Sequence, residues 1–355
     1  MIELSTEYLG LKLKSPLVPS ASPLSRSLDQ ARALEDAGAA ALVMYSLFEE
    51  EMGAESSEME RRLIDQAIAH VAAAGFSVPH FRYRDGLEQY LQHLSALKAA
   101  LDIPVIASLN GVGMSSWVEV GRELERAGAD AIELNVYYIA ADFAQTPDTI
   151  EARFLYVLKS LRDAVSLPIA MKISPYFCAL PAFVQKLEAS GANGVVLFNR
   201  FFQPDIDLET LAPSDQHLLS GHTERLLAMR WVSLLHGRVG LGLSASGGIY
   251  TWEDALKMLL AGADVVNLTS ALLQHGPARL TEILDGVRAW MEARGYESLD
   301  RFRGMLSQRS RPDLGTLTRE GYMMSLDHHD PQTSSAGNSL SKPDRFAHGD
   351  GDGHQ

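Results

Sequence analysis

The sequence predicts an α/β protein of the (β/α)8 type, a TIM barrel. Eight short apolar runs recur along the chain, and a longer amphipathic stretch separates each run from the next. Strands that alternate with helices indicate parallel βαβ units, and eight units in about 300 residues fit one barrel. A doubly wound sheet is the alternative, but the turn Ser20-Ala21-Ser22-Pro23-Leu24 lacks the Gly-rich pattern expected after its first strand.

The expected strands are the apolar runs themselves, in chain order: Leu17–Ala21, Ala40–Ser46, Pro104–Asn110, Ala131–Val136, Pro168–Ser174, Gly194–Asn199, Val239–Ser246 and Val265–Ser270. Signals that end helices precede them. A glycine between small residues, which suits a helix C-cap with positive φ, stands before four runs, at Gly38, Gly128, Gly191 and Gly262. Pro104 and Pro168 end the helices before the third and fifth runs.

Composition narrows the class of protein. The 355 residues are 46% hydrophobic and 21% charged, with a formal net charge of −14. An acidic chain repels phosphate backbones, so no nucleic-acid partner is expected, although a local site for one phosphate group stays open. The single cysteine, Cys178, excludes an intramolecular disulfide. Because there is no apolar stretch of about 18 residues and no signal-peptide pattern, we expect a cytoplasmic protein with no membrane partner.

The domain organisation follows from a shift in composition near Leu326. We expect one barrel over residues 1–325 and a disordered tail over residues 326–355, where His, Asp, Ser, Gly and Pro prevail. A metal-binding tail is the alternative reading of its histidines, His328, His329, His348 and His354. The second crossover, about residues 48–97, is unusually long, and it suits either a lid over the barrel mouth or a solvated surface excursion.

The ends of the last two runs indicate a phosphate site. Gly247 and Gly248 close the seventh run, and Thr269 and Ser270 close the eighth. Glycines let the backbone approach a ligand closely, and N–H groups at a helix start favour an anion. Barrels commonly hold a phosphate in the loops after strands seven and eight, so we expect one here, with plain tight turns as the alternative.

Polar residues on other strand ends suit a flavin. Lys172 lies inside the apolar fifth run, where a charged group without a partner is costly to bury. It would favour an anionic cofactor such as a reduced flavin, and a structural ion pair with Glu133 is the alternative. Asn110, Asn135 and Asn199 end three further runs, and their amides match the edges of a flavin or pyrimidine ring.

These features resemble the class 1 dihydroorotate dehydrogenases. The similarity spans roughly residues 1–289 and fails only in the long crossover and the tail. The segments that carry it are Leu9–Leu17, Glu133–Asn135, Met171–Pro175, Ser246–Ile249, Asp254–Ala255, Leu260–Ala263 and Thr269–Leu272.

The resemblance implies an FMN-dependent oxidoreductase that acts on CH–CH bonds, converting dihydroorotate to orotate in pyrimidine biosynthesis. It implies that the FMN phosphate is held by Gly247, Gly248, Thr269 and Ser270. It implies flavin contacts from Ala21, Ser46, Asn110, Asn135 and Lys172. It also implies substrate contacts from Asn135 and Asn199, and no metal site.

The loop after the fourth run departs from the family pattern. Members carry a cysteine or serine base followed by Pro-Asn, whereas this loop is Val136-Tyr137-Tyr138-Ile139-Ala140. Tyr138 stands at the position of the base, so Tyr138 and Lys172 are the two candidate catalytic residues. Ala140 replaces a substrate-binding asparagine. A tyrosine with a pKa of about 10 is a poor base at neutral pH, though its neutral form can donate a proton.

Two further positions bear on the chemistry. Tyr45 stands where the family has a lysine. Cys178 could supply a thiolate, but a lone cysteine is more often a buried, unreactive side chain.

We therefore expect an FMN-dependent oxidoreductase that resembles dihydroorotate dehydrogenase, acts on a small-molecule substrate and forms a homo-oligomer. The sequence does not identify the electron acceptor. Two alternatives stay open: an FMN barrel acting on a different substrate, or a flavin- or phosphate-binding barrel without catalysis, as a subunit of a redox complex.

Overall fold

A computed structural model describes residues 2–49, 86–111, 117–200, 203–214, 219–310 and 319–327. The chain divides into two units, Met1–Arg311 and Pro312–Gln355. The described part of the second unit is helix α12 (Arg319–Asp327). Most of the predicted tail lies outside the described residues, so its disorder stays a prediction.

Eight parallel strands form the centre of the first unit, in the order β3-β12-β11-β8-β7-β6-β5-β4. The two outer strands, β3 and β4, also lie in contact, so the sheet curves round as a barrel. The predicted (β/α)8 barrel and its eight strands are thereby confirmed. The observed bounds are β3 (Leu17–Pro19), β4 (Leu42–Phe48), β5 (Val105–Asn110), β6 (Ala131–Asn135), β7 (Ile169–Ile173), β8 (Gly194–Leu197), β11 (Gly242–Ser246) and β12 (Val265–Leu268).

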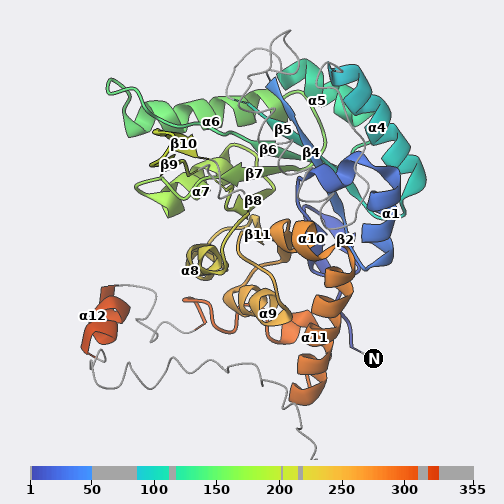
Figure 1. Cartoon of the computed structure of the whole chain (residues 1–355), viewed down its shortest axis with the longest axis vertical. Coiled ribbons are helices and arrows are strands. Elements are labelled where there is room, and N and C mark those ends of the chain that lie inside the picture. The colour runs from blue at the N-terminus through green and yellow to red at the C-terminus, as the bar shows by residue number, and fades with distance from the viewer. Residues whose placement is uncertain are drawn as a thin grey trace, which may run out of the picture. The chain divides into compact units, whose positions relative to one another are not determined.

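Helices surround these strands (Figure 1). They are α1 (Leu28–Asp36), α4 (Gly86–Ala100), α5 (Trp117–Arg126), α6 (Pro147–Arg162), α7 (Leu180–Ala189), α8 (Arg225–Leu235), α9 (Trp252–Ala261), α10 (Ser270–His275) and α11 (Ala278–Arg294). The four predicted C-cap glycines have φ between 94° and 116°, as expected for a left-handed cap. Helix α4 fills the end of the long second crossover, and residues 50–85, where a lid was considered, lie outside the described part.

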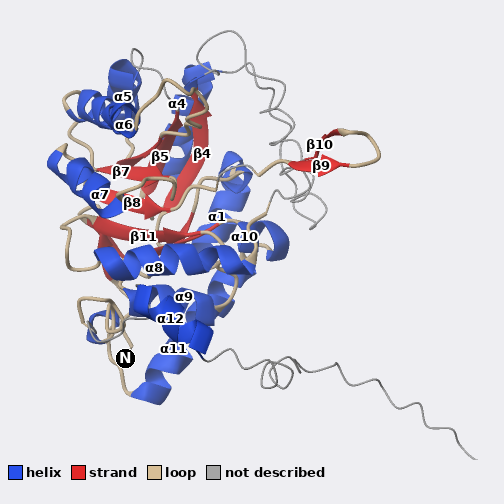
Figure 2. Cartoon of the chain, turned by 90° about the vertical axis from the view of Figure 1, so that its left-hand side faces the viewer, coloured by secondary structure: helices blue, strands red, loops and turns tan. Residues whose placement is uncertain are grey.

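Two hairpins are added to the barrel. Strands β1 (Thr6–Tyr8) and β2 (Leu11–Leu13) pair antiparallel, and Tyr8 packs against the glycines that begin β8 and β11. This hairpin therefore closes the N-terminal end of the barrel. Strands β9 (Asp205–Asp207) and β10 (Ala212–Ser214) form a second hairpin after β8, which projects from the barrel (Figure 2).

The barrel interior changes from apolar to polar towards the C-terminal ends of the strands. An interior apolar cluster includes Val18, Ile106, Ala131, Ala170, Val196 and Val265. Side chains two residues apart on a strand share a face, so the next interior layer contains Ser20, Ser108, Glu133, Lys172, Phe198 and Asn267. A functional site is therefore expected above this second layer.

A bulge in β4 changes which side chain faces the interior. The pairing of β4 with β5 shifts between Val43 and Ser46. As a result Ser46, rather than Tyr45, meets Ser108 of the next strand, with the two hydroxyl oxygens 2.9 Å apart. The Tyr45 ring instead packs edge-on against Tyr90, with centroids 5.0 Å apart. A bulge of this kind is not visible in the apolar pattern.

Candidate functional site

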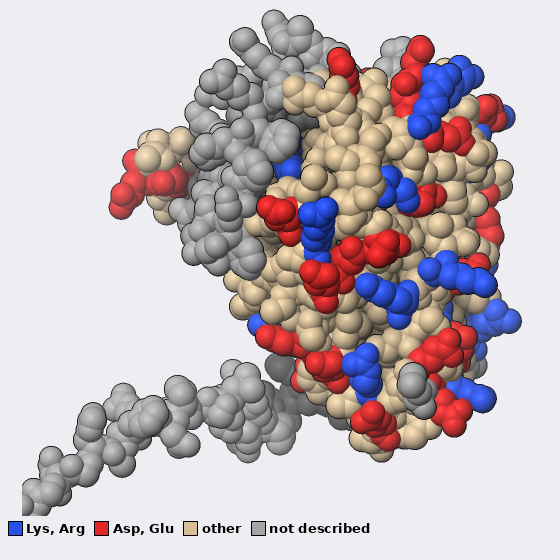
Figure 3. Space-filling view, turned by 90° about the vertical axis from the view of Figure 1, so that its right-hand side faces the viewer, with Lys and Arg blue, Asp and Glu red and all other residues tan. Residues whose placement is uncertain are grey.

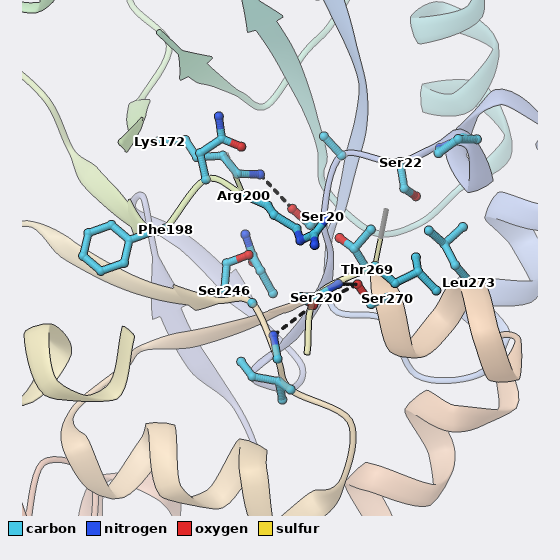
Figure 4. Close-up of a pocket in the computed structure, with 18 residues that line it drawn as sticks. Ser20, Ser22, Lys172, Phe198, Arg200, Ser220, Ser246, Thr269, Ser270 and Leu273 are labelled. Carbon is cyan, nitrogen blue, oxygen red and sulfur yellow. Dashed lines mark hydrogen bonds between the residues drawn. The ribbon is translucent and has the colours of Figure 1, made fainter. Parts of the chain in front are cut away.

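A cavity of about 220 Å³ opens where β3, β7, β8, β11 and β12 end (Figure 4). Seven residues chosen from the sequence line it: Ala21, Lys172, Asn199, Gly247, Gly248, Thr269 and Ser270. Ser20, Ser22 and Ser246 also line it, and the lining is completed by Pro23, Phe198, Arg200, Leu219, Ser220, Ile249, Asn267 and Leu273. The structure thus brings together residues that lie up to about 250 positions apart, as expected for a barrel mouth.

Lys172 connects the barrel interior to the cavity. Its Nζ donates to Ser20 Oγ at 3.0 Å and to Glu133 Oε1 at 3.1 Å. The side chains of Lys172 and Glu133 are only 8% and 2% exposed. The ion pair that the sequence left as an alternative is therefore present, and the same ammonium group lines the cavity. Glu133 stabilises the charged form of Lys172 at a depth where an isolated ammonium would be costly.

The two glycines after β11 have different surroundings. Gly247 has φ of 94°, and a Cβ added there would meet no atom within 4 Å. Gly248 has φ of 67°, and its added Cβ would lie 2.5 Å from the Gly221 carbonyl oxygen. Gly248 N donates to Ser220 Oγ at 3.0 Å, and the Ser220 and Ser270 hydroxyls lie 2.9 Å apart. Gly247 therefore leaves open space beside the cavity, while Gly248 packs against a neighbouring turn.

The chemistry of the lining favours an anionic, hydroxyl-rich ligand. Six of its side chains carry a hydroxyl, and they are Ser20, Ser22, Ser220, Ser246, Thr269 and Ser270. Two cations, Lys172 and Arg200, line the cavity, and none of its described lining residues is Asp or Glu. A sugar-alcohol phosphate would find both hydrogen-bond partners and compensating charge here.

Several lining residues were missed by sequence reasoning. Asn267 is 4% exposed and lies on β12 two residues after Val265, so the alternation along that strand could have identified it. Arg200 directly follows Asn199, and a charge beside a strand end was an available signal. Ser220 precedes α8 in irregular chain, where no periodic pattern pointed to it.

Three predicted flavin contacts lie outside the described cavity lining. Ser46 pairs with Ser108, as described above, and Asn110 is buried at the end of β5. Asn135 accepts a hydrogen bond from Asn199 Nδ2 at 2.8 Å, and Asn199 in turn lines the cavity. Their roles as flavin and substrate ligands stay predictions.

Tyr138 faces helix α6 rather than the described cavity lining. Its hydroxyl donates to Gln145 Oε1 at 2.9 Å, and the Arg153 guanidinium carbon lies 4.4 Å from its ring centroid. Ala140, at the position of the family's substrate-binding asparagine, is exposed. Cys178 is exposed as well, so the expectation of a buried thiol is wrong: the loop after β7 leaves it at the surface.

Two further properties of the described residues bear on partners. None of their helices is long and apolar enough to cross a membrane. Within the same residues, no three His, Cys, Asp or Glu side chains are grouped so as to hold a metal ion. On the face drawn in Figure 3, acidic and basic side chains are interspersed, without the continuous basic track that binds nucleic-acid backbones.

Fold and cavity together define a class of protein: a (β/α)8 barrel whose strand ends surround a cavity lined by hydroxyl groups and two cations, with a buried lysine on strand β7. The sequence model described as "Dihydroorotate dehydrogenase" matches residues 3–291. The chain belongs to the dihydroorotate dehydrogenase family, and the predicted resemblance is confirmed. It is accordingly an oxidoreductase of the flavin-dependent type that acts on CH–CH bonds.

The similarity to known proteins extends over nearly the whole length of each relative. A "Putative dihydroorotate dehydrogenase A (fumarate)" of Aeropyrum pernix is 29% identical over 306 residues, which are 84% of this chain and 95% of the relative. A "Dihydroorotate dehydrogenase B (NAD(+)), catalytic subunit" of Methanosarcina mazei is 28% identical over 83% of this chain and 93% of its own. The protein of the same description from Thermoplasma acidophilum is 25% identical, with 86% and 99% covered.

Proposed function

We propose that the cavity binds FMN and that the chain is an FMN-dependent oxidoreductase of the dihydroorotate dehydrogenase type. The observation that carries the proposal is the lining itself, in which a glycine turn, six hydroxyl side chains and two cations meet with no carboxylate among the described lining residues. The open space beside Gly247 fits a phosphate, and the hydroxyls fit a ribityl chain. FMN, which carries one phosphate, suits this single turn better than a dinucleotide does.

The site residues take roles consistent with this ligand. Gly247, Gly248, Thr269 and Ser270 would hold the phosphate through N–H and hydroxyl groups. Ala21 would lie against the ring system, and Lys172 would face its pyrimidine edge. When bound, FMN would supply the hydride acceptor for a CH–CH bond. Lys172, held by Glu133, would contribute a positive charge next to the ring where negative charge develops.

Ser46, Asn110 and Asn135 are proposed as ligands that engage when the cofactor and substrate are present. Asn199 would contact the substrate directly, since it lines the cavity. Its bond to Asn135 would then orient the amide of each residue. Apo geometry does not disqualify such groups, because hydrogen bonds in active sites often tighten only in the complex.

A different ring substrate is the second candidate, and the loop after β6 favours it. Tyr138 is bonded to Gln145 and Ala140 is exposed, and the loop has no cysteine or serine and no asparagine at the positions where the family has its base and its amide. General base catalysis typically contributes about 10²–10⁴-fold. Turnover with dihydroorotate should therefore fall well below that of a member with the usual loop.

The test is anaerobic stopped-flow reduction of the purified, FMN-loaded protein by dihydroorotate, followed at the flavin absorption band. Slow but saturable reduction supports the first candidate. Reduction by dithionite but not by dihydroorotate supports the second. A protein that retains no FMN and binds none in calorimetry would contradict both candidate functions. Fumarate and NAD⁺, the acceptors that the relatives' descriptions name, are the first oxidants to offer the reduced protein.

A further inference from the structure

Asn267 is a buried amide of the cavity that has no role in the function proposed above. It lies on β12, its side chain lines the cavity, and only 4% of the residue is exposed. In the pairing of β12 with β11 it stands opposite Ser246, which also lines the cavity, so the two side chains share the interior face of the barrel. A polar side chain at this depth needs a hydrogen-bond partner.

The amide of Asn267 differs from the neighbouring polar groups of the barrel interior in its hydrogen bonding. Ser20 and Glu133 both accept a hydrogen bond from Lys172. The Asn267 side chain makes no hydrogen bond within the described part of the chain, and its nitrogen and oxygen are not fully enclosed. A buried amide without a partner costs free energy, so a ligand in the cavity is the partner to expect.

Asn267 lies between the two groups of residues that the proposed function assigns to FMN. Thr269, a proposed phosphate ligand, follows two residues later in the chain, about 7 Å nearer the cavity mouth. Ser20 comes two residues after Val18, which pairs with Asn267, and it accepts from Lys172 Nζ at 3.0 Å (Figure 4). Asn267 is therefore deeper than the phosphate end and beside the lysine that would face the ring.

We propose that the Asn267 amide binds hydroxyl groups of the ribityl chain of the bound flavin. This inference rests on the proposed function. The ribityl chain joins the phosphate to the ring, so it would pass the residue that lies between their proposed ligands. An amide both donates and accepts, as each ribityl hydroxyl does, and the Ser246 hydroxyl opposite offers a second partner. A carbonyl or N–H of the ring edge is the second source of the same hydrogen-bond chemistry.

A ligand-binding amide and a structural amide predict opposite effects on the empty protein. Asn267→Leu roughly keeps the shape of the side chain and removes both polar groups. If only a ligand satisfies the amide, the melting temperature of the apo-protein should equal that of the wild type or rise, because an unsatisfied group is removed. Asn267→Ala removes the amide without adding bulk, so it controls for a clash of the leucine.

Flavin affinity is measured by titrating the apo-protein and following flavin fluorescence. In Asn267→Leu and Asn267→Ala, FMN and riboflavin should both bind about tenfold more weakly, since a buried hydrogen bond is lost from a part that the two ligands share. Lumiflavin, which has the ring but no ribityl chain, should stay within about twofold. The visible absorption maxima of bound FMN should not move, because the ring keeps its contacts.

Asn193→Leu is the matched control. The Asn193 side chain accepts the Ile169 N–H at 2.9 Å and lies outside the described cavity lining. Its loss leaves a backbone donor without that partner, so it should lower the melting temperature of the apo-protein and leave all three flavin affinities unchanged.

The other outcomes overturn the ribityl contact. A tenfold loss for lumiflavin as well, with shifted absorption maxima of bound FMN, would assign the amide to the ring edge. A loss for FMN alone would assign it to the phosphate. If no flavin affinity changes in either variant, Asn267 contacts no part of the flavin, and a lowered melting temperature would identify its amide as structural.

Failure of the proposed function gives a different result. A wild type that binds none of the three flavins contradicts FMN binding, and the ribityl contact fails with it. If the wild type binds FMN and the two Asn267 variants bind it equally well, the proposed function stands and only the ribityl contact is contradicted.

Discussion

The two halves of the barrel mouth differ in what their sequence motifs do in the fold. On the side of β11, β12 and β3, the predicted residues line one cavity, and they are Ala21, Gly247, Gly248, Thr269 and Ser270. On the side of β4, β5 and β6, Ser46 and Asn135 bond to neighbouring side chains, and Tyr138 packs towards α6.

The difference shows that the two kinds of site depend on different properties of the chain. The proposed phosphate site needs a glycine turn at one strand end and hydroxyl residues at the next, and both features are local in sequence. A site made of side chains also depends on bulges and loop paths, which turn a residue towards the cavity or away from it.

The largest expected effect comes from the pair that joins the two halves, Lys172 of the cavity and Glu133 of β6. Lys172→Met should lower the free energy of unfolding by about 3–5 kcal/mol, because a buried carboxylate is left without its partner. Urea denaturation measures it. Lys98→Met is the matched control, since the Lys98–Asp130 pair is more than a quarter exposed, and its loss should cost about 1 kcal/mol or less.

The double variant Lys172→Met/Glu133→Leu sharpens this test. Replacing a buried pair with apolar side chains is often close to neutral, so it should recover most of the lost stability. A double variant as unstable as Lys172→Met alone would mean that Lys172 is needed for packing or for Ser20, and that Glu133 is not its main partner.

The next effect tests the backbone side of the comparison. Gly247→Val should reduce FMN affinity by about 100-fold, because the added side chain fills the open space and strains a backbone with φ of 94°. Calorimetry with FMN measures it. Gly247 is the better position for this test, because a side chain on Gly248 would also clash with the Gly221 carbonyl oxygen.

Gly10→Val is the matched control for Gly247→Val. Gly10 lies in the β1–β2 turn with φ of 74°, and it too has no atom within 4 Å of an added Cβ. Its substitution brings similar strain at the other end of the barrel and should leave FMN affinity unchanged. Equal losses in both variants would mean that strain, rather than the cavity, explains the effect.

A smaller effect is expected across the boundary between the halves, at Asn135 and Asn199. A double-mutant cycle of Asn135→Ala and Asn199→Ala should give a coupling of about 0.5–1.5 kcal/mol in the free energy of unfolding, as for one hydrogen bond. Asn193, whose side chain accepts the Ile169 N–H at the opposite barrel end, should show no coupling to Asn135. Zero coupling between Asn135 and Asn199 would mean that their hydrogen bond does not link the β6 side of the barrel mouth to the cavity lining.

The smallest effect is expected at Tyr138. Tyr138→Phe should leave FMN content unchanged and keep the flavin reduction rate within about twofold, since its hydroxyl bonds to Gln145 and lies outside the described cavity lining. The stability loss should be about 1 kcal/mol or less. Reduction slowed tenfold or more, with an altered pH profile, would instead identify Tyr138 as a proton-transfer group.

Sequence reasoning located the strands more reliably than the directions of side chains. All eight runs became strands, because burial on both faces of a parallel sheet imposes continuous apolar stretches. Strand ends and the family resemblance together gave seven of the lining residues. The same reasoning did not foresee the β4 bulge that turns Ser46, rather than Tyr45, towards Ser108, and it expected Cys178 to be buried.

By itself, the sequence determined the barrel and the glycine turn where the phosphate site is proposed, because apolar periodicity and positive φ act over a few residues. Only the tertiary structure decided which polar groups meet. Lys172 and Ser20 are 152 residues apart in the chain, and Ser220 and Ser270 are 50 apart. Closing the barrel brings the ends of distant strands to one rim, and the bulge and loop paths then select which side chains reach the cavity.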